Sequence, residues 1–244
     1  MLEAVTLDFW NTLFVDSNGT RRERQRLAVL REELAAAGLA RSQLALDEGI
    51  QAGFDFFDEI WLSQHRTPLC GEIVDAILAS LRAYLPAEAR ERITTQFQWQ
   101  LLDHPPEPMP GLLTTLPVLA GRYRLAVVCD TGFSPGVVIR KLLDRYCLLE
   151  YFTYLYFSDE HGVSKPDVRA FGTTLDALGV RASQAAHVGD LQRTDVAGAQ
   201  AAGMLAVHFV GANDYDAPRS TADAIVRHFE DLPAALGNLV CPGC

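Results

Sequence analysis

The chain has 244 residues, of which 49% are hydrophobic and 21% charged, so it can bury a core and is not intrinsically disordered. Its formal net charge of −10 argues against general binding of nucleic acid, which needs a basic surface. No stretch approaches the roughly 18 apolar residues of a membrane helix, and Glu3 and Asp8 replace the basic start of a secretory signal. We therefore expect a cytoplasmic protein with no nucleic-acid or membrane partner, either a monomer or a homodimer.

The elements predicted for the first 111 residues are one strand and a run of helices. Residues 4–9 are mostly apolar around Asp8, which predicts a buried strand with a carboxylate at its carboxyl end. Helical periodicity follows, without strand-like alternation in between, over residues 21–38, 43–62, 70–84 and 88–102. The proline-rich segment 104–111 cannot continue a helix and predicts a hinge.

After the hinge, helices and strands alternate. Helices are predicted over residues 112–120, 135–146, 168–178 and 195–202. Short buried strands are predicted over residues 125–129, 151–157, 185–188 and 205–209. This alternation is typical of right-handed βαβ units in a parallel sheet, to which the first strand also belongs. We predict an α/β core from residues 1–16 and 108–240, an all-helical domain inserted at residues 17–107, and a tail at residues 241–244.

The five cysteines, without a visible signal sequence, are expected to be reduced thiols. Two of them, Cys241 and Cys244, form a C-x-x-C at the end of the chain. A metal or redox role for this pair would need a folded context and further ligands, so we interpret it as part of a frayed tail.

Polar groups stand at four strand ends of the predicted sheet, the edge at which open parallel sheets bind ligands. Asp8 ends the first strand, and Cys129-Asp130-Thr131-Gly132 ends the second. Lys165, one of only two lysines in the chain, follows the third strand, and Gly189-Asp190 ends the fourth. A single carboxylate there is often only a helix N-cap. An acid, a hydroxyl, a lysine and an acid pair at successive strand ends instead predict a catalytic site.

With these four motifs, nearly the whole chain resembles the haloacid dehalogenase-like hydrolase superfamily. The resemblance implies a Rossmann-like parallel sheet core with a helical cap inserted after the first motif. It also implies that Asp8 is the nucleophile, that the second motif with Asp130 contacts the substrate, and that Lys165 neutralises charge. Mg²⁺ would be held by the carboxylates of Asp8 and Asp190 and by the backbone carbonyl of Trp10.

The chemistry of phosphoryl transfer agrees with this assignment. A carboxylate that attacks an anionic phosphoryl group must overcome like-charge repulsion, which a divalent ion and a lysine reduce. Asp195, five residues after Asp190, is either a metal ligand, a partner for Lys165 or a helix N-cap. We therefore expect a Mg²⁺-dependent hydrolase that acts on a small phosphorylated metabolite through an aspartyl-phosphate.

The chain departs from the phosphatase pattern at Trp10. Phosphatases of the superfamily carry an Asp at this position, two residues after the nucleophile, and it protonates the leaving group; an indole cannot do so. Because general acid–base catalysis contributes about 10²–10⁴-fold, we expect weak hydrolysis of alkyl phosphates unless Asp16 substitutes. Asp16 is otherwise a capping residue of the first cap helix, and Trp10 is expected to contact the substrate.

Two other functions remain open at this point. The 2-haloacid dehalogenases have Tyr at the position of Trp10 and need no metal, but they typically lack the Gly-Asp pair that is intact here at Asp190. A catalytically weakened binding or regulatory protein on the same scaffold is favoured by Trp10 and Cys129. The retention of Asp8, Lys165 and Asp190 argues against it.

Two further features have more than one interpretation. Cys129 aligns with the usual Ser or Thr of the second motif, whereas Thr131 supplies the hydroxyl if the loop register shifts by two residues. Cys129 is also a candidate nucleophile, although a buried strand-end cysteine is more often inert. On the first cap helix, a group of arginines either steers anions toward the site or forms an ordinary solvated face, namely Arg21, Arg22, Arg24 and Arg26.

Overall fold

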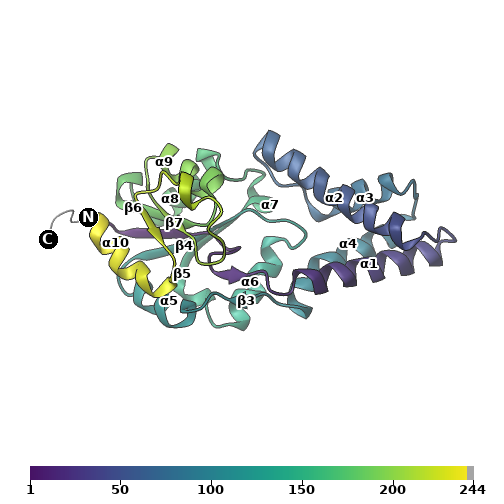
Figure 1. Cartoon of the computed structure of the whole chain (residues 1–244), viewed down its shortest axis with the longest axis horizontal. Helices are drawn as coiled ribbons and strands as arrows, with labels where there is room; N and C mark the ends of the chain where they lie inside the picture. Colours follow the sequence, from purple (N-terminus) through teal and green to yellow (C-terminus); the bar gives the residue numbers. More distant parts are fainter. Residues whose placement is uncertain (241–244) are drawn as a thin grey trace.

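The computed structural model describes residues 1–240, so the C-x-x-C of the predicted tail lies outside the described residues. Figure 1 shows a sheet with helices on both faces and a group of helices that extends from it, away from the end that carries the chain termini. The predicted fold class is confirmed: a Rossmann-like parallel sheet carries an inserted all-helical domain.

Six parallel strands form the central sheet, in the order β5-β4-β1-β6-β7-β8. Their bounds are β1 Ala4–Leu7, β4 Arg124–Cys129, β5 Phe152–Phe157, β6 Ala185–Gly189, β7 Leu205–Phe209 and β8 Ala224–Val226. Strand β1 lies in the middle, with Leu7 opposite Val127 on one side and Val188 on the other. The residues that follow these three strands therefore emerge together at one edge of the sheet.

The alternation of side chains along the strands gives the sheet two different faces. On one face, apolar side chains such as Val5 and Leu7 pack against three helices of the core, α5 Leu112–Ala120, α6 Gly136–Arg145 and α10 Leu232–Val240. The other face carries small residues such as Ala4 and Ala126, which pack against α8 Val168–Leu178 and α9 Ala197–Ala201. Both faces are covered, which is why the strands read as buried apolar runs rather than as alternating ones.

The helical insert consists of four helices with a core of their own. They are α1 Gly19–Ala36, α2 Gln43–Gln64, α3 Cys70–Ser80 and α4 Ala87–Asp103, around buried residues such as Leu34, Ile73 and Phe97. Helix α2 approaches α3 closely at Gly53, where an added Cβ would lie 2.7 Å from the side chain of Ile77. A larger residue at this point would push the two helices apart.

A two-stranded antiparallel ribbon joins the insert to the core. Strand β2 Phe14–Val15 pairs with β3 Glu107–Pro108, which lies within the segment predicted as a hinge. The ribbon lies beside the predicted boundaries of the helical domain, at residues 16–17 and 107–108. It holds the two crossings between core and insert side by side.

The structure also contains elements that the sequence patterns did not predict. These are the ribbon, the short helix α7 Ser158–His161, strand β8 and helix α10. The helix predicted from residue 195 is divided, because a π-helical turn at Gln192–Val196 precedes α9. Among the described residues, no helix combines the length and apolar character needed to cross a bilayer.

Candidate active site

A cavity of about 300 Å³ opens at the carboxyl edge of the sheet, beneath helix α2. Strand ends and loops of the core supply the charged residues that line it, namely Asp8, Asp130, Lys165, Asp190 and Asp195. Helix α2 contributes the aromatic side chains of Phe57 and Trp61. The structure therefore brings together acids and a lysine that the sequence spreads over more than 180 residues.

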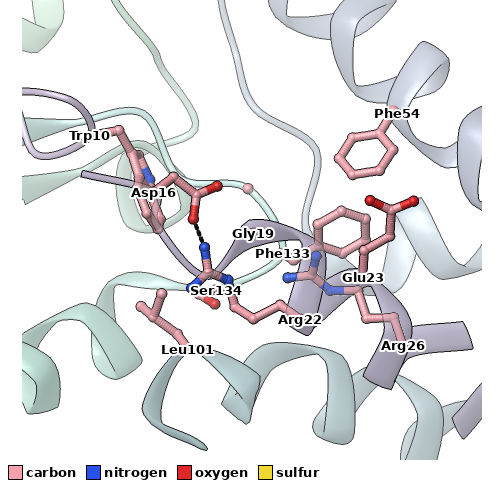
Figure 2. A pocket seen from close by; sticks show the side chains of 11 residues that line it. Trp10, Asp16, Gly19, Arg22, Glu23, Arg26, Phe54, Leu101, Phe133 and Ser134 are labelled. Carbon is pink, nitrogen blue, oxygen red and sulfur yellow. Dashed lines mark ion pairs between the residues drawn. The ribbon is translucent and has the colours of Figure 1, made fainter. Parts of the chain in front are cut away.

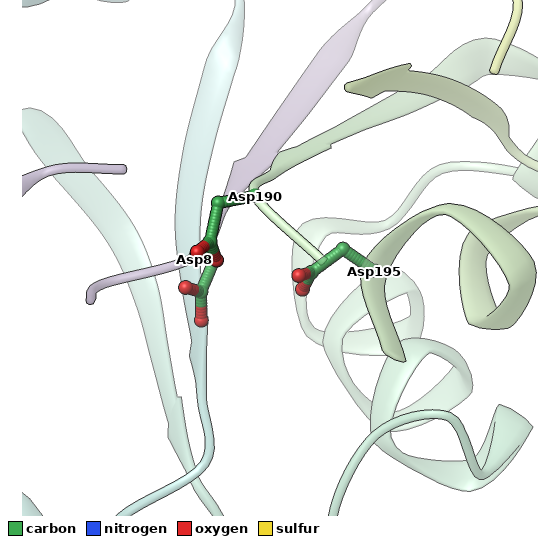
Figure 3. A group of neighbouring side chains, drawn as sticks. All are labelled: Asp8, Asp190 and Asp195. Carbon is green, nitrogen blue, oxygen red and sulfur yellow. The ribbon is translucent and has the colours of Figure 1, made fainter. Parts of the chain in front are cut away.

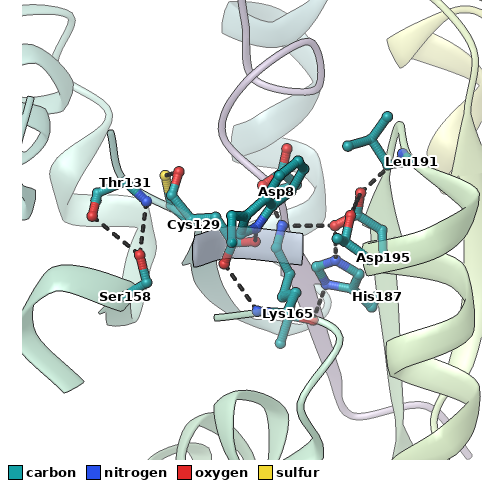
Figure 4. Close-up of polar contacts among 12 residues, drawn as sticks. Asp8, Cys129, Thr131, Ser158, Lys165, His187, Leu191 and Asp195 are labelled. Atoms are coloured by element: carbon teal, nitrogen blue, oxygen red, sulfur yellow. Dashed lines mark hydrogen bonds and ion pairs between the residues drawn. The ribbon is translucent and has the colours of Figure 1, made fainter. Parts of the chain in front are cut away.

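Lys165 lies at the centre of the acidic groups and is only 2% exposed. Its Nζ donates hydrogen bonds to the carboxylate of Asp8 and to Oδ1 of Asp195, the latter at 2.7 Å (Figure 4). Burial opposes the charge of Lys165, but the carboxylates of Asp195 and Asp8 raise its pKa well above the usual value. Lys165 is therefore an ammonium ion, and Asp195 is its partner, one of the roles considered for that residue.

Asp195 is held in place by groups on three sides. Besides Lys165, it accepts from the backbone N–H of Leu191 at 2.9 Å, and its Oδ1 lies 3.1 Å from Nε2 of His187. The other ring nitrogen of His187 lies 2.8 Å from the Thr6 hydroxyl, so Nε2 donates when Nδ1 accepts from Thr6. Although burial raises the pKa of Asp195, Lys165 and His187 bring it well below the usual value, so this carboxylate is ionised.

Asp8, Asp190 and Asp195 form an acidic cluster in which one ligand atom from each residue lies within 4.8 Å of the others (Figure 3). The amide of Asn213 donates to Asp190 at 3.2 Å. Burial and the nearby charge of Asp195 raise the pKa of Asp190 to about 7, and burial raises the pKa of Asp8 well above its usual value. Three buried carboxylates thus share a single ammonium.

This charge pattern fits a divalent cation. When the three carboxylates are ionised and Lys165 is protonated, two negative charges are left without a partner, which is the charge that Mg²⁺ neutralises. Carboxylate oxygens are also the ligands that Mg²⁺ prefers. Asp195 is engaged by Lys165, Leu191 and His187. Asp8 and Asp190 make fewer contacts, Asp8 with Lys165 and Asp190 with Asn213, and would hold the ion.

Asp130, from the second motif, connects the core to the helical insert. Its Oδ2 accepts from Nε1 of Trp61 on α2 at 2.9 Å, and its Oδ1 accepts from the backbone N–H of Lys165 at 3.0 Å. The ring of Trp61 also lies 4.3 Å from the guanidinium carbon of Arg193. Asp130 therefore fixes both the loop of the lysine and the aromatic wall of the cavity.

Cys129 and Thr131, the other candidates from the second motif, do not line this cavity. Cys129 is fully buried, and burial raises the pKa of its thiol, which opposes formation of a nucleophilic thiolate. Thr131 is also fully buried, and both its N–H and its hydroxyl contact Oγ of Ser158, at 2.8 and 3.1 Å (Figure 4). Their predicted catalytic roles gain no support from this placement, whereas Asp130 and Gly132 do face the cavity.

Trp10 forms part of the cavity wall on the side of the nucleophile. Its ring packs edge-on against Phe9, with centroids 5.1 Å apart, and Arg22 lies 5.8 Å from the ring. Asp16, the residue considered as a substitute acid, forms an ion pair with Arg22 and does not line this cavity. Asp16 instead lines an adjoining cavity together with Trp10 and Arg22.

The family model for haloacid dehalogenase-like hydrolases matches residues 2–203. The chain belongs to this family. Membership confirms the resemblance drawn from the four motifs and, at the level of the family, the prediction of a hydrolase. It does not by itself choose between a phosphate ester and a 2-haloacid as substrate.

Similar proteins include both phosphatases and a dehalogenase. The pyrimidine 5'-nucleotidase YjjG of Escherichia coli (strain K12) is 32% identical over 116 residues, which are 47% of this chain and only 50% of that protein. The phosphoglycolate phosphatase of Photorhabdus laumondii subsp. laumondii is 28% identical over 97% of this chain and 93% of that one. The crystal structure of a 2-haloacid dehalogenase from Pseudomonas syringae pv. Tomato DC3000 has a TM-score of 0.72 at 27% identity, covering 98% of this chain and 99% of that one.

Proposed function

We propose that the protein is a Mg²⁺-dependent phosphatase that acts on a small phosphorylated metabolite through an aspartyl-phosphate at Asp8. The observation that carries the proposal is the buried group of three carboxylates near Lys165, which, when all three are ionised, has two more negative charges than one ammonium neutralises. The nucleotidase and the phosphoglycolate phosphatase named above support a phosphate ester as substrate.

Each of the polar residues in the cavity has a separate role in the proposed reaction. The Asp8 carboxylate attacks phosphorus, the bond from phosphorus to the bridging oxygen breaks, and the leaving alkoxide, aryloxide or carboxylate takes up any proton it needs from solvent. Water then attacks the same phosphorus, which releases inorganic phosphate and returns Asp8. Lys165 is held by Asp195 so that its charge faces the phosphoryl oxygens. Asp8, Asp190 and the carbonyl of Trp10 would hold Mg²⁺, which would supply charge neutralisation when bound.

The dehalogenase alternative has two observations in its favour. An aromatic residue lies beside the nucleophile at Trp10, and the fold resembles that of the Pseudomonas syringae enzyme over 98% of the chain. Displacement of halide requires neither an acid for the leaving group nor a metal. A dehalogenase would therefore not need the second buried carboxylate, Asp190, beside Asp8. For this reason we rank the dehalogenase second.

A trapping experiment tests the proposal. The protein is mixed with Mg²⁺ and ³²P-labelled acetyl phosphate, quenched in acid within the first turnover and digested. We expect the label on the peptide that contains Asp8, and hydroxylamine should release it as an acyl phosphate. Label on the peptide of Cys129, or phosphate release without any labelled peptide, would contradict the proposal.

Addition of Mg²⁺ to the chelator-treated protein is expected to raise its melting temperature, because a cation relieves the repulsion between Asp8 and Asp190. At a Mg²⁺ concentration about 100 times the dissociation constant, the gain is about 2.7 kcal/mol. Asp190→Asn should abolish the shift, while Asp176→Asn, a change at an exposed acid on α8, should leave it intact. An equal shift in wild type and Asp190→Asn would place the cation elsewhere.

Trp10→Asp is expected to raise the rate on alkyl phosphates more than the rate on aryl or acyl phosphates. Only the poor leaving groups need a proton in the transition state, and an acid at this position contributes up to about 10²–10⁴-fold. The ratio of the two rates is measured for wild type and variant, with a thermal melt as control, because loss of the indole costs about 3–5 kcal/mol. An unchanged ratio in the folded variant would show that Trp10 does not replace an acid.

A further inference from the structure

A second cavity, also of about 300 Å³, lies between helix α1 of the insert and the loop after β4 (Figure 2). Two arginines of α1, Arg22 and Arg26, line it together with Phe54 and Phe133. Both arginines are buried, at 3% and 7% exposure, although a run of charges on a helix is normally a solvated face. The cavity therefore has a cationic wall that helix packing alone does not require.

No carboxylate within residues 1–240 forms an ion pair with the guanidinium of Arg26. Within residues 1–240, its guanidinium makes no hydrogen bond or ion pair, and its buried Nε has no partner. It stacks on Phe133, with its central carbon 4.1 Å from the ring centroid. Burial, with the charge of Arg22, lowers the pKa of Arg26 to about 10. A buried charge without a partner is unfavourable, and the usual remedy is an anion.

The acidic residues near this cavity do not supply that anion. Asp16 forms an ion pair with Arg22. Arg22 also donates a hydrogen bond to the backbone carbonyl of His104 at 2.6 Å. Glu23 also lines the cavity and its charge acts on Arg26, but its side chain is exposed and makes no ion pair with Arg26 in the described residues. Arg26 is thus left as a buried cation without a hydrogen-bonded anion among residues 1–240, a contact that a ligand carboxylate would supply.

The second cavity adjoins the active site, since Trp10 and Gly132 line both. We propose that Arg26 binds a carboxylate carried by the same substrate whose phosphoryl group lies at Asp8, so that the substrate is a short phosphorylated organic acid. A guanidinium matches a carboxylate in two parallel hydrogen bonds. Phe54 and Phe133 suit the carbon chain between the two anionic groups. This inference rests on the proposed function.

Binding to the Asp8→Asn variant tests the carboxylate site without turnover. Calorimetry with Mg²⁺ compares 2-phosphoglycolate with its carboxamide, which has nearly the same shape and lacks the second charge. We expect the acid to bind about 10–100-fold more tightly, the range of charge-assisted hydrogen bonds. Equal affinities, or no binding of the acid, would overturn the inference, and this comparison requires no change at Arg26.

Variants of helix α1 test whether Arg26 is the residue that makes 2-phosphoglycolate bind more tightly than its carboxamide. In the Asp8→Asn background, Arg26→Gln should remove the preference for the acid, and Arg26→Lys should restore part of it. Arg24→Gln, at an exposed position of the same helix, should leave the preference unchanged. An acid preference that survives Arg26→Gln in a protein with wild-type secondary structure would overturn the assignment.

The two proposals can fail separately. If the acid binds through Arg26 but the active protein releases no phosphate from it, the proposed phosphatase reaction is wrong and the carboxylate site stands. If both 2-phosphoglycolate and its carboxamide are hydrolysed equally well and Arg26→Gln changes neither KM, the phosphatase stands and the carboxylate site is wrong.

Discussion

Replacing Asp8 by asparagine is expected to reduce hydrolysis by more than about 10⁴-fold while the protein stays folded. The amide keeps the shape of the carboxylate but cannot attack phosphorus. The change also removes one of the three negative charges around Lys165, where burial has already raised the pKa of Asp8. The melting temperature without Mg²⁺ should therefore not fall.

Turnover of an aryl phosphate and a thermal melt, both on Asp8→Asn, provide the measurement. Asp176→Asn, an exposed position on α8, is the control for an unrelated change of acid to amide. Near-wild-type turnover by folded Asp8→Asn would place the nucleophile elsewhere. Cys129→Ser would then be the next variant to examine, since Cys129 is a nucleophilic side chain at the end of the neighbouring strand β4.

Lys165→Met is expected to lower both activity and stability. Without the ammonium, the carboxylates of Asp8 and Asp195 are buried with no cationic partner, and removal of one partner from such a group costs about 3–5 kcal/mol. For a chain of this size, that corresponds to a fall in melting temperature of roughly 6–20 °C. The loss of stability relative to wild type should shrink as the pH is lowered. In the variant, the unpaired carboxylates of Asp8 and Asp195 have raised pKa values in the folded state, so protonation stabilises the folded variant.

Lys141 provides a matched control, because it is the only other lysine of the chain and is exposed on α6. Thermal melts of wild type, Lys165→Met and Lys141→Met are compared in chelator at several pH values. We expect Lys141→Met to melt within a few degrees of wild type. A Lys165→Met protein as stable as Lys141→Met would show that the acidic groups are not balanced by Lys165.

The residues of the acidic site could be predicted because their position follows from topology. Asp8 and Asp190 each come directly after a short apolar strand, and Lys165 lies in the loop that follows β5 and α7. Parallel strands bring such positions to one edge of the sheet. Fold class follows from the same alternation of strands and helices. Neither argument depends on how side chains pack.

Other parts of the site depend on contacts that leave no local pattern. His187 is one polar residue inside a buried strand, and only the fold shows that it faces Asp195. Asn213 lies in a loop without a motif. The ribbon of β2 and β3 joins two-residue segments about 90 residues apart in the sequence, too short for any periodicity. Whether Arg26 has a counter-ion is likewise decided by packing, so the sequence does not distinguish it from the exposed Arg24.

The central claim is that the acidic cluster supports metal-dependent phosphate release rather than displacement of halide. The most direct measurement assays phosphate release from 2-phosphoglycolate, acetyl phosphate and an aryl phosphate in parallel with chloride release from 2-chloropropionate. Each assay is run with Mg²⁺ and with chelator. We predict phosphate release that stops in chelator and returns with excess Mg²⁺, without release of chloride. Chloride release that continues in chelator, with no phosphate released from any ester, would contradict the account.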